Sequence, residues 1–66
     1  MNTIKKNDDE TIIIEEITPA KIRLRVKDKK DKTKIKKEVF SYNEEEDHCK
    51  AFRLFDEEVE KQKKEG

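Results

Sequence analysis

The stretch Lys21-Ile22-Arg23-Leu24-Arg25-Val26-Lys27 decides the fold, because apolar and cationic residues alternate in it without a break. Side chains along a β-strand point alternately to opposite faces of the sheet. Residues 21–27 are therefore predicted to form a strand that buries one row of side chains and exposes the other. The apolar row is Ile22, Leu24 and Val26, and the cationic row is Lys21, Arg23, Arg25 and Lys27.

One further strand is predicted on each side of this stretch. Residues 11–17 are rich in β-branched isoleucine, which suits a pleated surface, and Pro19 then favours a turn. Residues 33–40 alternate imperfectly, because Ile35 and Phe40 fall on opposite faces of a regular strand. A bulge within this strand would bring both side chains to the buried face, so both are expected in the core.

A helix is predicted over residues 43–64 from apolar residues at helical spacing. Acidic residues crowd its first turn and lysines its last turn, which complements the helix dipole. Ser41 with Glu44 fits the capping-box pattern, and Asn43 with Glu46 is the competing choice.

The predicted fold is α+β, a three-stranded antiparallel sheet packed against one C-terminal helix in the order βββα. Residues 11–64 form this single small domain, and the polar, aperiodic residues 1–10 form a disordered N-terminal tail. Sheet and helix close one two-layer core. Its expected members are Ile12, Ile14, Ile22, Leu24, Val26, Ile35, Phe40, Phe52, Phe55 and Val59.

Size and composition exclude several classes of protein. The chain has 66 residues, of which 30% are hydrophobic and 52% charged, so it builds one thin core. No apolar run is long enough to span a membrane, and the N-terminus lacks a secretory signal pattern. A single cysteine, Cys49, forbids an intrachain disulfide and suits a reducing interior, so a cytoplasmic location is expected.

Neither catalysis nor cofactor binding is expected. The acids lie in solvated runs rather than in a desolvated cleft, and the single glycine, Gly66, provides no phosphate-cradling loop. His48 and Cys49 diverge by about 100° on a helix, and no other histidine or cysteine completes a metal site. Cys49 is expected to be a small buried apolar residue, and His48 a residue of the helix rim.

The charges are unevenly distributed along the chain. Lysine plus arginine and aspartate plus glutamate both number 17, yet residues 21–37 carry a formal charge of +8 between flanks of −3 and −5. If these segments fold onto different faces, the surface is strongly dipolar. The acidic runs 44–47 and 56–58 are explained by helix capping and solubility, with a basic partner as the alternative.

The cationic row of residues 21–27 is the candidate binding site. Its cations lie about 6.6 Å apart, and lysines of the next strand would add a second column. A two-stranded ribbon fits the major groove of duplex DNA, where arginines read guanine edges and lysines meet phosphates. The alternative is a solvated face whose lysines suppress edge association. The predicted nucleic-acid-binding residues are Lys21, Arg23, Arg25, Lys27, Lys34 and Lys36.

Two basic strand segments and a helix carry a family resemblance. The segments are Lys21-Ile22-Arg23-Leu24-Arg25-Val26 and Lys34-Ile35-Lys36-Lys37-Glu38-Val39-Phe40, followed by the acidic-capped helix with Phe52. Together they resemble, over about residues 11–64, the small N-terminal domain of phage and transposon tyrosine recombinases that binds arm-type DNA sites. The resemblance implies a sheet that enters the major groove, with the helix behind it. It places DNA binding on Arg23, Arg25, Lys34 and Lys36.

Three kinds of partner are compatible with this sequence. Duplex DNA is the first. Small, highly charged α+β proteins of phages and mobile elements often bind and inhibit host proteins, so a protein-interaction or inhibitor module is the alternative. A structural subunit that forms a homodimer through an exposed Leu54 is the third. No membrane partner is expected.

Overall fold

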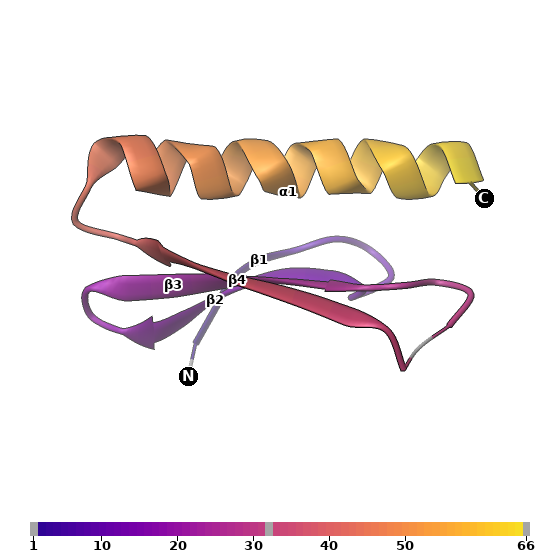
Figure 1. Cartoon of the computed structure of the whole chain (residues 1–66), viewed down its shortest axis with the longest axis horizontal. Coiled ribbons are helices and arrows are strands. Elements are labelled where there is room, and N and C mark those ends of the chain that lie inside the picture. The colour runs from indigo at the N-terminus through magenta and orange to yellow at the C-terminus, as the bar shows by residue number, and fades with distance from the viewer. Residues whose placement is uncertain (1, 32, 66) are drawn as a thin grey trace.

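The computed structural model describes residues 2–31 and 33–65 as one sheet and one helix. The elements are β1 (Asn2–Lys6), β2 (Ile12–Thr18), β3 (Lys21–Lys27), β4 (Ile35–Ser41) and α1 (Glu45–Glu65). All neighbouring strands are antiparallel, in the order β1-β2-β3-β4. The helix lies along one side of the sheet, and no other described element covers the opposite side (Figure 1).

The α+β class, the antiparallel sheet and the C-terminal helix confirm the prediction, whereas the expected number of three strands is wrong. Residues 2–6, expected in a disordered tail over 1–10, form β1 and pair with β2. Lys5 helps to explain this difference. Its Nζ lies 4.8 Å from the centroid of the Phe55 ring and 3.5 Å from Asp56 Oδ1. A cation–π contact and an ion pair thus join β1 to the helix.

The core lies between α1 and the central strands. Residues directly opposite each other on antiparallel strands share a face, and the register pairs Ile12 with Val26 and Ile14 with Leu24. The buried core consists of Ile12, Ile14, Ile22, Leu24, Phe40, Ala51 and Phe55. Packed against it and partly buried are Val26, Phe52, Leu54 and Val59. These residues include nine of the ten predicted core members.

Ile35 is the exception, and its predicted place in the core is wrong. Its exposed fraction is 42%. β3 and β4 pair without a register shift from one end to the other, so the expected bulge in the last strand does not form. Ile35 therefore shares a face with Lys27, its partner on β3, while Phe40 points to the opposite face and is buried.

The helix begins at Glu45, later than the capping-box pattern predicts. The carbonyl of Glu44 accepts a hydrogen bond from the His48 N–H at 2.9 Å, which makes Glu44 the N-cap. Both predicted N-caps, Ser41 and Asn43, therefore lie too early. Ser41 belongs to β4 instead, and its backbone N–H donates to Asp47 Oδ2 at 3.4 Å.

A chain of polar contacts joins the β1–β2 turn to the end of α1. Asn7 Oδ1 accepts hydrogen bonds from the backbone N–H groups of Thr11 and Ile12. Thr11 Oγ1 donates to Gln62 Oε1 at 2.6 Å, and Gln62 Nε2 donates to the Lys27 carbonyl at 3.0 Å. Gln62 is buried, and both ends of its amide are satisfied. The side chain therefore links the helix to the turn and to the end of β3.

We predict that Gln62→Ala lowers the free energy of unfolding by about 1–2 kcal/mol, because it removes the partner of the Thr11 hydroxyl and of the Lys27 carbonyl. Urea denaturation of the variant and the parent protein measures this loss. Lys64→Ala, an exposed substitution two residues further along the helix, is the control and is expected to change stability by less than about 0.5 kcal/mol. Equal stabilities of the two variants would contradict the assigned role of Gln62.

Candidate functional site

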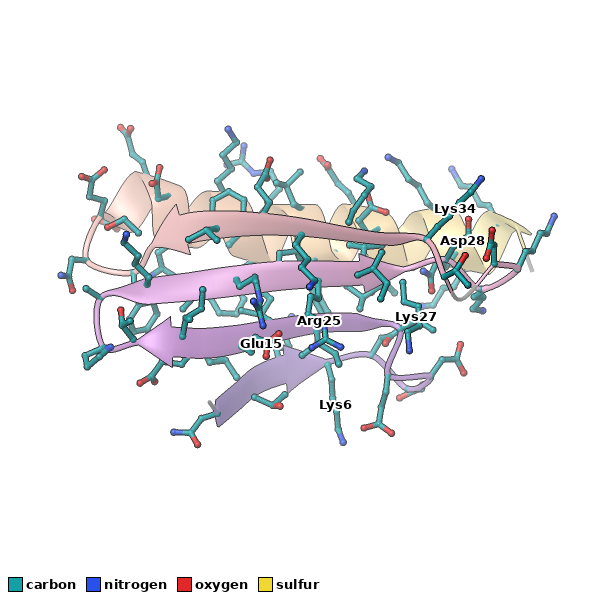
Figure 2. All side chains as sticks on the ribbon, turned by 60° about the horizontal axis from the view of Figure 1, so that its bottom comes forward. Lys6, Glu15, Arg25, Lys27, Asp28 and Lys34 are labelled. Atoms are coloured by element: carbon teal, nitrogen blue, oxygen red, sulfur yellow. The ribbon has the colours of Figure 1, made fainter. Side chains whose placement is uncertain are left out.

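The open face is the side of the sheet that faces away from α1. The register assigns to it Thr3, Lys6, Ile13, Glu15, Thr18, Lys21, Arg23, Arg25, Lys27, Ile35, Lys37, Val39 and Ser41. The cations of β3 all belong to this face, as the alternation of residues 21–27 predicts. Figure 2 shows Glu15 and Arg25 near the middle of the face, with Lys6 on β1 and Lys27 at the end of β3.

The structure separates the two remaining predicted site residues from this row. Lys36 pairs with Val26 and therefore lies on the helix side of the sheet, where its Nζ is 3.9 Å from Glu58 Oε1. The expected second column of cations through Lys36 is thus wrong. Lys34 precedes β4 in the β3–β4 loop, and Figure 2 shows it beyond the strand beside Asp28.

Two cations of the open face were absent from the predicted site. Lys37 on β4 lies directly opposite Arg25 on β3. On the other side of Arg25, Ile13 of β2 is its partner, and Lys6 of β1 is the partner of Ile13. The signal for Lys37 was present in the sequence, because an unbroken strand places it on the same face as Ile35. Lys6 carried no such signal, since its strand has only five residues and no apolar alternation.

Glu15 occupies the centre of the open face and is the feature that sequence analysis missed. Although it lies on the side opposite the helix, it is only 7% exposed. Arg23 donates to Glu15 Oε1 from Nε at 3.3 Å and from Nη2 at 3.0 Å, and Arg25 donates to the same oxygen from Nη1 at 3.3 Å. One carboxylate on β2 therefore holds in place both guanidinium groups of the neighbouring strand β3.

The surroundings of Glu15 act on its pKa in opposite directions. Burial of the carboxyl raises the pKa, whereas the hydrogen bonds and positive charges of Arg23 and Arg25 lower it, and together they hold it below the ordinary value of 4.5. Glu15 is therefore ionised at neutral pH. A carboxyl poised for proton transfer near pH 7 has its pKa shifted the other way, so Glu15 is suited to positioning charge and not to general acid–base chemistry.

The helix side of the molecule offers a groove of about 420 Å³ between β4 and α1. Its lining includes Leu24, Val26 and Leu54, flanked by Lys36 and Glu58. Leu54 is partly buried and packs against the core, so the expectation that it is exposed for a dimer interface is wrong. The groove is lined by apolar residues and by side chains of both charges. This lining does not indicate a particular class of ligand.

His48 and Cys49 do not form a shared site. Cys49 is exposed, which corrects the prediction that it is buried. His48 packs between the rings of Tyr42 and Phe52, with centroid distances of 4.9 and 5.1 Å. Within residues 2–31 and 33–65, no group of three or more histidine, cysteine, aspartate or glutamate side chains could hold a metal ion. Over that same part of the chain, no helix has the length and apolar character needed to cross a membrane.

We predict that acid destabilises the protein through Glu15. Because its folded-state pKa is lowered, the stabilisation is complete above pH 4.5 and is lost as the pH falls through the folded-state value. Glu15→Gln is expected to lose about 1–2 kcal/mol at pH 7 and to show a shallower decline in stability below pH 4.5. Urea denaturation at a series of pH values measures both effects.

The control is Glu57→Gln, which removes an exposed carboxyl from the helix and is expected to change stability at pH 7 by less than about 0.5 kcal/mol. A Glu15→Gln variant as stable as the parent protein at pH 7 would show that the two arginines do not depend on this carboxylate.

Comparisons with known proteins found no relative from which a function could be transferred. No protein-family model matches the chain, and neither the curated proteins nor the solved structures include a match. A function for this chain is therefore inferred from the geometry and the charge of the open face.

Proposed function

We propose that the open face binds the phosphate backbone of duplex DNA. The observation that supports this proposal is the unequal distribution of charge between the two sides of the molecule. Strand positions on the open face hold six cations and one carboxylate, a formal charge of +5. The helix on the opposite side carries eight acids and five bases, a formal charge of −3. A polyanion is therefore attracted to the sheet side and repelled by the helix side.

The individual cations suit contacts with phosphates. Among the side chains that the structure describes, Lys21, Lys27 and Lys37 form no ion pair with an acid, so their charges are available to a ligand. Arg25 directs Nη1 to Glu15, and a guanidinium has five N–H donors, so it can donate to a phosphate oxygen at the same time. Glu15 reduces the entropy that Arg25 loses on binding, because it already holds the side chain in place.

The width of the sheet favours backbone contacts over insertion into a groove. Four strands enclose three interstrand spacings of about 4.8 Å, or about 14 Å before side chains are counted. The major groove of B-DNA is about 12 Å wide. The whole sheet therefore lies across the groove instead of entering it, and we propose binding with little sequence preference.

Duplex is favoured over single-stranded nucleic acid by the absence of a stacking platform. None of the open-face positions of β1–β4, all of which are described, holds an aromatic side chain. Phe40 points to the helix side, and Tyr42 lies beyond the end of β4. Proteins that bind single strands without sequence preference stack bases on aromatic rings, which this face does not offer.

We predict that the triple variant Lys21→Glu, Lys27→Glu and Lys37→Glu binds a fluorescently labelled DNA duplex more weakly than the parent protein does. A titration at several salt concentrations measures the affinity and its salt dependence. For each neutralised phosphate the slope of log K against log salt is about −0.9, so removing three contacts reduces its magnitude by about 2.7. Arg23 and Arg25 stay unchanged in this variant, which preserves their contacts with Glu15.

The matched control is Lys50→Glu, Arg53→Glu and Lys64→Glu, which changes the net charge equally but alters exposed positions of the helix. It is expected to keep the slope of the parent protein. Two outcomes would refute the proposal. The first is no duplex binding by the parent protein at about 50 mM salt. The second is an equal loss of binding in both triple variants, which would show that overall charge and not the open face is responsible.

A further inference from the structure

β4 is an open sheet edge that lacks the protection found at the opposite edge. β1 is short and carries a register shift between Thr3 and Lys5, and such a bulge discourages pairing with another strand. β4 has seven residues and pairs with β3 in an unbroken register. Figure 2 shows it at the margin of the sheet, and no other strand of the described residues lies beside it.

The backbone of β4 presents hydrogen-bonding groups along this edge. The Lys34 carbonyl accepts from Asp28 and the Tyr42 N–H donates to Ala20, so the even-numbered residues of the strand direct their backbone groups towards β3. The odd-numbered residues consequently direct theirs outward. Three of them, Ile35, Lys37 and Val39, form a row of donors and acceptors to which another strand could pair.

We propose that this edge pairs with β4 of a second copy of the chain, antiparallel and with Lys37 on the two-fold axis. In this register Ile35 lies opposite Val39, and Lys36 lies opposite Glu38, and each pair occurs twice. Ile35 and Val39 are 42% and 53% exposed in the single chain. The dimer therefore covers two exposed apolar side chains of each copy and creates two cross-strand pairs of opposite charge.

Other registers of the same pairing lack this complementarity. A shift that places Glu38 on the two-fold axis sets Lys36 opposite Phe40 and Lys37 opposite Val39, so it forms no ion pair. A shift that places Lys36 on the axis sets the apolar Ile35 opposite the cation Lys37 and leaves Val39 beyond the strand of the partner. The register centred on Lys37 alone pairs apolar residues with apolar residues and each Lys36 with a carboxylate.

Such a dimer forms a continuous eight-stranded sheet with both helices on one side and both open faces on the other. This inference does not depend on the proposed binding of DNA, because it rests on the edge of β4 and not on the ligand of the open face. Each copy brings its own Lys37 to the axis, and the repulsion between the two opposes dimerisation at low salt.

A charge-swap experiment tests the pairing of Lys36 with Glu38. Sedimentation equilibrium of the full chain, from about 1 μM to about 1 mM, measures its self-association. Lys36→Glu and Glu38→Lys each replace two attractive pairs with two repulsive ones, and each is expected to weaken the dimer by about tenfold or more. The double variant restores the attraction in reversed order and is expected to dimerise like the parent protein. A parent protein that is monomeric throughout, or single variants that associate equally well, would overturn the proposal.

A disulfide experiment tests the register. In a Cys49→Ser background, Lys37→Cys places two thiols opposite each other on the axis, where Cα atoms about 5.5 Å apart fall within disulfide range. Ile35→Cys is the control on the same face of the same strand, but it is offset from its own copy by four residues, about 14 Å. Rapid crosslinking of Lys37→Cys alone is expected. Equal crosslinking of both variants, or of neither, would overturn the assigned register.

Discussion

The antiparallel register between β2 and β3 is the constraint on which the rest of the structure depends. It places Ile12 opposite Val26 on the helix side and Glu15 opposite Arg23 on the open face. Since side chains alternate along a strand, a slip of one residue would exchange the two faces, bury arginines beneath the helix and expose the isoleucines. The hydrophobic core and the basic surface therefore follow from the same pairing, and neither can change without the other.

Charged side chains add to the packing that the small number of apolar residues provides. Only 30% of the chain is hydrophobic, and the buried core residues come from β2, β3, β4 and α1. On the helix side, the ammonium group of Lys5 lies over the ring of Phe55, and on the open face Arg23 and Arg25 cover Glu15. Long cationic side chains can bury their aliphatic stems while the charged ends stay near water. In this molecule the cationic side chains both form part of the surface and pack against the residues beneath them.

Much of the fold was predictable because it follows from local patterns. The seven alternating residues of β3 and the apolar spacing of α1 identified these elements, and the faces of all four β3 cations followed. The errors arose where a tertiary contact decides the outcome. β1 has no hydrophobic pattern and depends on contacts with β2 and α1, while Ile35 and Lys36 take their faces from an unbroken register with β3. The burial of Glu15 could not be deduced either, because it requires two arginines on another strand.

The contact between Thr11 and Gln62 bridges a sequence separation of 51 residues, and it couples the folding of two distant parts of the chain. Helix ends ordinarily fray, and terminal hairpins are marginal when isolated. Here the first turn of the chain and the last turns of the helix hold each other through one buried amide. Bringing together residues so far apart in the sequence costs conformational entropy. The contact offsets this cost only when both ends of the loop are ordered at the same time. The β1–β2 turn and the end of α1 therefore belong to a single cooperative unit, and neither can unfold locally without loosening the other.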